Sequence, residues 1–171
     1  MTLTIRNVAV NSLYYAGTLA ALPAAALWLQ ARWAGLPGSP WPVRGVGVVL
    51  GLSGVLLQVG SIALLQTRGS GTPSPVAPPV RLVTEGPYAW LRNPINLGEV
   101  LLFLALAAWF AAWILFVYSI LAWLVFHVFI VVWEEPRHER LYRGEFARYR
   151  ARVPRWLPRR PAVPQCNERP S

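Results

Sequence analysis

The chain has 171 residues, of which 55% are apolar and 13% are charged, and its formal net charge is +9. This length fits one domain, and several long windows with almost no charge exclude an ordinary soluble core in favour of membrane spans. All sixteen basic residues are arginines, and ten of them follow Trp133, which fits a cytoplasmic segment facing anionic lipid better than nucleic-acid binding. The single cysteine, Cys166, excludes an internal disulfide and a metal site made of cysteines alone, and we expect no metal.

Two apolar segments open the chain. We expect the first, residues 8–33, to cross the membrane with a kink at Pro23. The second, residues 43–66, is also expected to span, and its Gly47 and Gly51 form a G-x-x-x-G pattern that we interpret as close helix packing. We treat residues 1–66 as an N-terminal unit of two spans.

The next segment, residues 67–96, is a long connection that begins with many Pro, Gly and Ser residues and is therefore expected to begin as a loop. Its end belongs to the stretch GPYAWLRNPINLG, which is polar and well punctuated although apolar segments lie on both sides. We expect Pro94 and the glycines to interrupt the helix at the membrane edge, where irregular backbone is tolerated only beside a cavity. The alternative is an ordinary helix start capped by Pro94.

Residues 97–133 are almost continuously apolar, and at about 1.5 Å per residue they are too long for one span. Two spans joined by a turn near residues 109–113 fit better, giving about four spans in all, with five as the alternative. From Glu134 onward the composition predicts a polar helix, a break at Gly144, a second helix and an end bounded by prolines. The predicted fold is therefore an all-α integral membrane protein whose last two spans form a helical hairpin, followed by a cytoplasmic helical segment.

Arginine counts set the expected orientation. With four spans, Arg6, the three arginines of the 67–96 loop and the ten of the tail share one side, whereas only Arg32 and Arg44 lie on the other. The positive-inside rule then places both termini and the loop in the cytoplasm. We expect a multi-pass protein of a bacterial inner membrane.

Residues 67–96 with NPINLGE, followed across the hairpin by HVFIVVWEEPRHERLYRGEFARYRARVPRWLP, resemble the isoprenylcysteine carboxyl methyltransferase family and the related phospholipid N-methyltransferases. Arg92, Pro94 and Gly98 match an R-x-P-x-x-x-G frame, and Glu134 and Glu135 match the acidic pair of that family. The resemblance covers about residues 67–158, taken as the methyltransferase core, and leaves residues 159–171 as a disordered basic tail. It implies a small membrane enzyme that uses S-adenosylmethionine (SAM), releases S-adenosylhomocysteine and acts on a lipid or another lipophilic acceptor.

The resemblance also implies a cofactor site under the C-terminal helices. Arg92, Glu135 and His127 are the candidates for roles in the reaction. The residues expected to bind the cofactor are Tyr88, Arg92, Asn93, Pro94, Asn96, Leu97, Gly98, Glu134, Glu135, Tyr149 and Arg152. Two of them depart from the family pattern, because Asn93 stands where the family has His and Asn96 where it has Tyr.

The chemistry of SAM gives these residues their expected roles. A carboxylate such as Glu135 can bind hydroxyl or ammonium groups, freed backbone groups near Pro94 can hold adenine or ribose, and Arg92 can hold a carboxylate with its planar fork. Ordinary interfacial pairing of the two glutamates with Arg137 or Arg140 is the structural alternative. For an acceptor that must lose a proton, the candidate bases are Glu135, His127 and Tyr149.

Two further ionisable residues lie within predicted spans. His127 precedes Glu134 by seven residues, so a regular helix places both on nearly one face. There His127 could orient the glutamate, make a polar contact to the cofactor or simply bond a neighbouring carbonyl. Glu99 could pair with Arg92 or the cofactor, or it could reach out to the membrane interface. The tail arginines, Arg152 included, could bind the cofactor or rest on anionic lipid.

Other functions remain open at this point. Within the same superfamily the acceptor could be a phospholipid amine or a small thiol instead of a lipophilic carboxylate. The chain could also be a non-catalytic membrane scaffold with this fold, or a relative of the sterol reductases, which use a nicotinamide cofactor.

Overall fold

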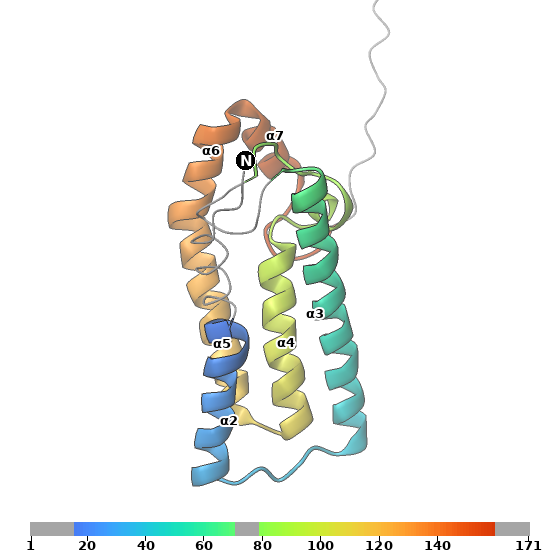
Figure 1. The fold of residues 1–171 in the computed structure, drawn as a ribbon, viewed down its shortest axis with the longest axis vertical. Helices are drawn as coiled ribbons and strands as arrows, with labels where there is room; N and C mark the ends of the chain where they lie inside the picture. The colour runs from blue at the N-terminus through green and yellow to red at the C-terminus, as the bar shows by residue number, and fades with distance from the viewer. Residues whose placement is uncertain (1–15, 71–78, 160–171) are drawn as a thin grey trace, which may run out of the picture.

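The computed structural model describes residues 16–70 and 79–159, which form an elongated bundle of helices (Figure 1). The start of the first predicted span with Arg6, residues 71–78 of the loop and the basic tail from residue 160 lie outside the described residues. The helical elements are η1 (Ala16–Ala21), α2 (Leu22–Trp33), α3 (Trp41–Thr67), η2 (Gly86–Ala89), α4 (Pro94–Phe110), α5 (Trp113–Phe129), η3 (Ile130–Glu134), α6 (Glu135–Tyr142) and α7 (Gly144–Arg152). The predicted all-α class is confirmed for the described residues.

The first helix is irregular where the sequence predicts it. Pro23 lies in the first turn of α2, and the turn before it, η1, is a π-helical turn. Because proline lacks an N–H and its ring crowds the preceding turn, a helix that runs into proline has to adjust there. The predicted kink thus takes the form of a π turn ahead of Pro23.

The centre of the bundle is the antiparallel pair α3 and α4, which lie side by side (Figure 1). Glycines set their separation, because a Cβ added to Gly98 would lie 2.7 Å from the carbonyl oxygen of Gly54. A Cβ on Gly47 would lie 3.0 Å from the Ala105 carbonyl oxygen, so the packing role expected for Gly47 is confirmed. Gly98 is therefore a packing residue at the middle of this interface.

The turn predicted near residues 109–113 is present between α4 and α5. Ala111 has a φ of 51°, and the Ala112 N–H donates to the Ala107 carbonyl at 2.9 Å. Gln30 of α2, which is only 1% exposed, bonds the turn on both sides: its amide nitrogen donates to Ala111 O at 3.3 Å and its oxygen accepts from Ile114 N at 3.1 Å. The side chain of Gln30 thereby satisfies backbone groups that the turn leaves free.

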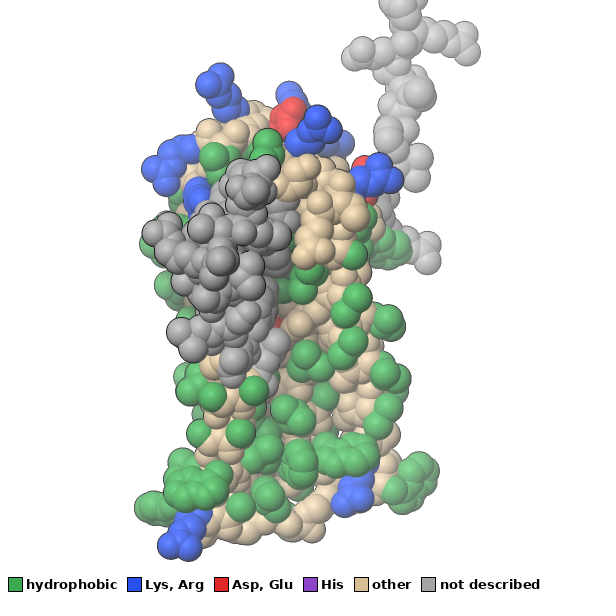
Figure 2. Space-filling model, in the orientation of Figure 1, with side chains coloured by type: hydrophobic (Ala, Val, Ile, Leu, Met, Phe, Trp, Pro, Cys, Tyr) green, Lys and Arg blue, Asp and Glu red, His purple; other side chains and the backbone are tan. Residues whose placement is uncertain are grey.

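Two of the described helices are long and apolar enough to cross a bilayer: Trp41–Thr67, and the continuous helix Trp113–Tyr142 formed by α5, η3 and α6. Helix α4 is apolar but has 17 residues, and α2 has 12, so the four predicted spans are not established. The helix sides are covered with apolar groups, and charged groups gather at the two ends (Figure 2). Trp33, Trp41 and Trp113 are 83%, 83% and 61% exposed at one end of the bundle, as is typical of a membrane interface.

Candidate active site

The site forms around Glu135, the first residue of α6, which is 8% exposed. Its Oε1 accepts from Arg92 Nη1 at 2.8 Å and from Arg155 Nε at 2.8 Å, and its Oε2 accepts from Arg155 Nη2 at 3.0 Å. We call these three residues the arginine clamp. Charge-assisted bonds of this length are strong, and a buried carboxylate needs them. The alternative in which Glu135 pairs with Arg137 or Arg140 is therefore wrong for Glu135, and the sequence pattern did not indicate Arg155.

Backbone contacts bring the two halves of the clamp together. The Arg92 N–H donates to the Pro154 carbonyl at 2.9 Å, and the Arg159 N–H donates to the Trp90 carbonyl at 3.0 Å. The Asn93 side-chain amide donates to the Arg155 carbonyl at 3.3 Å. The segment after α7 therefore lies against the segment before α4, as the expectation of a C-terminal cover requires.

A π turn separates the two glutamates. The turn η3 ends at Glu134, and Glu135 begins α6. The Glu134 side chain is 31% exposed and lies 3.9 Å from His138 Nε2, whereas the Glu135 side chain is 9% exposed and faces the arginines. Turns of this kind occur often at functional sites. The two glutamates are neighbours in the sequence and point in different directions, so their side chains lie in two different environments.

The same turn changes the position of His127. Because a π turn rotates less per residue than an α turn, the seven-residue spacing no longer places His127 on one face with Glu134. Instead His127 Nδ1 accepts a hydrogen bond from Trp156 Nε1 at 3.0 Å, and its ring stacks on Trp123 with centroids 5.6 Å apart. The expected role of His127 as an orienter of Glu134 is therefore wrong.

Tyr149 and Tyr88 lie behind the clamp. The buried Tyr149 hydroxyl donates to the Tyr88 carbonyl oxygen at 2.7 Å. Burial raises the pKa of Tyr149 from its ordinary value, although the nearby Arg92 acts in the opposite direction. A hydroxyl that already donates its proton and holds it more tightly is a poor general base, so Tyr149 is a structural support.

The helix interruption expected at NPINLG is wrong. Pro94 is the first residue of α4, a position where its missing N–H costs nothing, and the Leu97 N–H donates to the Asn93 carbonyl at 3.0 Å. Asn96, Leu97 and Gly98 lie inside the helix. The N–H groups of Leu97 and Gly98 are bonded within the helix, whereas that of Asn96 lies in the first turn, where an α-helix offers no acceptor. The alternative of a helix start capped by Pro94 is therefore correct.

Two other candidates lie away from the clamp. Glu99 on α4 is 2% exposed, so it does not reach the membrane interface, and the ion pair of Arg92 is made with Glu135. Arg152 is exposed, and its Nε donates to the Arg148 carbonyl at 3.3 Å, one turn back along α7. Glu99 is therefore a buried group of the helix bundle, whereas Arg152 lies on the surface.

The clamp carries a net positive charge, since two arginines face one carboxylate. Burial lowers the pKa of Arg92, the Glu135 carboxylate opposes that shift, and an arginine stays cationic in any case. Arg92 Nε is buried and has no hydrogen-bond partner among the described residues. These features suit a carboxylate or phosphate group, such as the carboxylate of SAM, better than the ammonium group first expected at Glu135. Among residues 16–70 and 79–159 no cluster of side chains could hold a metal ion.

Comparisons with known proteins give a match to one protein family. Neither the curated proteins nor the solved structures compared with the chain give a match. The phospholipid methyltransferase family matches residues 43–145, which run from the start of α3 to the start of α7. The match begins earlier than the resemblance read from the sequence, and it ends before Arg155. Members of this family are membrane methyltransferases that use SAM. With more than half of its length matched, this chain belongs to the phospholipid methyltransferase family.

Proposed function

We propose that this methyltransferase binds SAM beside the arginine clamp and transfers its methyl group to the amine of a phospholipid head group. The observation that carries the proposal is the partly buried clamp of Arg92, Glu135 and Arg155, whose excess positive charge lies near the end of a candidate membrane span. At this position the clamp is accessible both to a lipid head group at the membrane surface and to a water-soluble cofactor.

The proposed roles follow from the contacts. Arg92, through its free Nε, and Arg155 hold the carboxylate of SAM or the phosphate of the acceptor, two groups of the same chemistry. Glu135 is a positioning residue, because its oxygens accept from the two arginines and fix their planes. Asn93 supports this arrangement by bonding the Arg155 carbonyl.

SAM supplies a sulfonium methyl group that an acceptor atom attacks in line, so that the S–CH₃ bond breaks as the new bond forms. The protein's task is to align the two molecules and exclude water. An amine acceptor must arrive without its extra proton. Glu135 is engaged by two arginines and Tyr149 donates its own proton, so neither serves as the base.

The lack of a free base in the clamp favours one second candidate. A lipophilic carboxylate of the isoprenylcysteine kind needs no base, and a cationic clamp would attract it. This acceptor remains the alternative to the phospholipid amine.

The test is methyl transfer from radiolabelled SAM by the protein in nanodiscs. Phosphatidylethanolamine and a prenylated cysteine analogue are offered in separate reactions, with Arg155→Gln and Arg152→Gln as matched variants. We expect the wild type to transfer the labelled methyl group to phosphatidylethanolamine. Arg155→Gln should lose this activity, and Arg152→Gln should keep it. Label in the prenylated analogue alone would assign the carboxylate acceptor. Equal activity of both variants would contradict the role of the clamp.

A further inference from the structure

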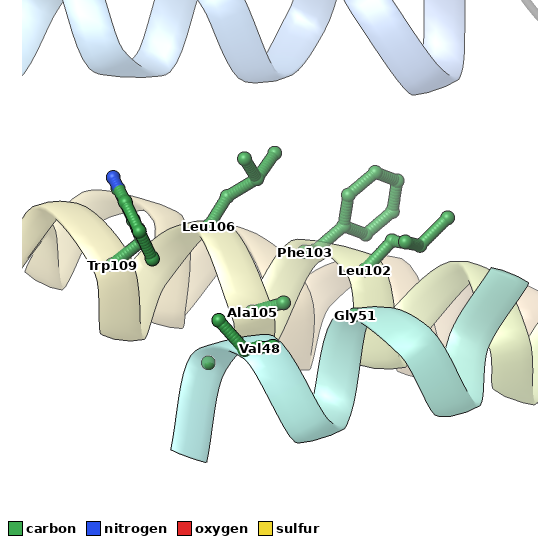
Figure 3. A pocket seen from close by; sticks show the side chains of 8 residues that line it. Val48, Gly51, Leu102, Phe103, Ala105, Leu106 and Trp109 are labelled. Atoms are coloured by element: carbon green, nitrogen blue, oxygen red, sulfur yellow. The ribbon is translucent and has the colours of Figure 1, made fainter. Parts of the chain in front are cut away.

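A groove lies at the end of the bundle opposite the clamp, with a volume of about 330 Å³. Helix α3 contributes one wall and α4 the other. Figure 3 shows Trp109, Leu106, Phe103 and Leu102 projecting from α4 on one side, with Val48 and Gly51 on α3. The volume is in the range of ligand sites, and all the lining residues are apolar or glycine.

The groove opens to the surroundings of the bundle. Its floor is buried, with Phe103 1% and Ala105 9% exposed, whereas Val48 and Trp109 at its edges are 46% and 42% exposed. Close contact of Gly47 and Gly51 with α4 closes the base of the groove. An apolar groove that opens sideways from a membrane helix pair faces lipid chains.

A cation stands at the mouth. The Arg44 guanidinium lies 5.7 Å from the ring centre of Trp109, one of the lining residues. Segments 22–52 and 102–120 form this end of the bundle. Arg32 and Arg44 are their charged residues, and neither segment contains an Asp or a Glu. The exposed Trp33, Trp41 and Trp113 lie at this same end, at the level where head groups are expected.

We propose that this groove is a binding site for one anionic phospholipid, with an acyl chain in the groove and the phosphate beside Arg44. The charge complementarity argues for an anionic lipid, since Arg44 has no carboxylate neighbour in these segments. The site is separate from the methylation site: the 17 residues of α4 lie between Arg92 and the turn at Ala111, a distance of about 25 Å along the helix. The bound lipid therefore belongs to the opposite leaflet and is not the methyl acceptor.

The test measures retained lipid by native mass spectrometry of the full chain released from nanodiscs. The probes are nanodiscs of phosphatidylglycerol and of phosphatidylcholine. We expect one phosphatidylglycerol per chain in the wild type. Arg44→Gln should bind it about fivefold more weakly, whereas Arg32→Gln, at the same end but away from the groove, should not change.

A second pair of variants tests the groove itself. Val48→Trp places an indole in the groove and should abolish retention of phosphatidylglycerol, whereas Val49→Trp on the neighbouring exposed position should retain it. Equal retention by these two variants, or equal retention of the two lipids by the wild type, would overturn the proposal. If the wild type forms a dimer that Val48→Trp abolishes and Val49→Trp does not, the groove binds a second copy of the chain. That result would also overturn the proposal. S-adenosylhomocysteine binding reports on the other end of the molecule and separates failure here from failure of the proposed methylation site.

Discussion

At the scale of single residues, Glu135 is the centre of the arginine clamp, because it bonds both Arg92 and Arg155. Its carboxylate neutralises one of two partly buried arginines, and Glu135 itself is 8% exposed. Removing one partner from a buried ion pair leaves the other charges without compensation, and this costs more than the pair contributes. The adjacent Glu134 has a more exposed side chain, and its contact with His138 Nε2 is long, at 3.9 Å. The two glutamates therefore form a natural matched pair.

We expect Glu135→Gln to destabilise the protein by about 3 kcal/mol, because Arg92 and Arg155 then face each other without a carboxylate. Thermal unfolding in detergent measures the loss. Glu134→Gln is the control and should change stability by less than about 1 kcal/mol. The double variant Glu135→Gln with Arg155→Gln should recover part of the loss. Equal effects of the two single variants would contradict the clamp.

Tyr149→Phe should lower stability by about 1 kcal/mol, the value of one hydrogen bond, and should leave the pH profile of methyl transfer unchanged. The raised pKa keeps Tyr149 neutral in the folded chain, and it is neutral in the unfolded chain below about pH 10, so it adds no pH dependence near neutrality. The checks are a melting curve and a pH–rate profile of the variant beside the wild type. If the wild-type rate rises with pH and this rise is absent in the variant, Tyr149 is the base after all.

At the scale of elements, the sequence predicted the long regular pieces. The length of the apolar segment 43–66 predicted helix α3. The apolar segment 97–133 is too long for one membrane span, and this predicted two helices, α4 and α5, with a turn between them. The break near Gly144 was also correct, although the left-handed residue is Arg143, with a φ of 46°, and Gly144 begins α7. Such helices can be predicted because the apolar pattern is averaged over many residues.

The same reasoning failed where one residue decides the geometry. A proline can begin a helix or interrupt one, and the sequence around Pro94 does not decide between the two. The π turn at η3 has no composition of its own, so the prediction that His127 and Glu134 share one face was wrong. Arg155 bonds Glu135 across 20 residues and Gln30 bonds Ile114 across 84, and the periodicity of a sequence does not detect such contacts. The clamp could be predicted in part, from Arg92 and Glu135 alone.

Gly98→Ala tests the contact of α3 with α4. The new Cβ would lie 2.7 Å from the Gly54 carbonyl oxygen, so the helices must separate, and we expect a loss of about 1–3 kcal/mol. Gly45→Ala is the control, because nothing lies within 4 Å of its Cβ, and it should gain up to about 1 kcal/mol. Melting temperatures in detergent that fall for both variants, or for neither, would contradict the role of this interface.

Pro94→Ala should leave the affinity for S-adenosylhomocysteine unchanged, because Pro94 begins α4 and most residues are accepted at that position. Calorimetric titration of wild type and variant makes the comparison. A clear loss of affinity would revive a role for a helix interruption in cofactor binding.

At the scale of the whole molecule, the two ends differ in charge and in chemistry. One end holds the clamp, α6 and α7 with their arginines. The other, where α2 ends and α3 begins, holds Arg32, Arg44 and exposed tryptophans (Figure 1). The apolar helix sides between them are suited to lipid. The C-terminal segment closes the catalytic end through the bonds of Arg92 to Pro154 and of Arg159 to Trp90.

Deleting residues 153–171 should therefore abolish both methyl transfer and S-adenosylhomocysteine binding, because Arg155 and the Pro154 carbonyl are removed. Deleting only residues 160–171 leaves the clamp whole and should preserve both. The two deletions are compared in nanodiscs by titration and radiolabel transfer. An active 153–171 deletion would show that the cofactor binds elsewhere.

The most direct test of the central claim is titration of the purified protein with S-adenosylhomocysteine, in parallel with Glu135→Gln, Arg155→Gln and Glu134→Gln. We predict saturable binding by the wild type and by Glu134→Gln, weakened by about tenfold or more in the two clamp variants. Clamp variants that remain folded and bind as tightly as the wild type would contradict the assignment of the cofactor to the arginine clamp.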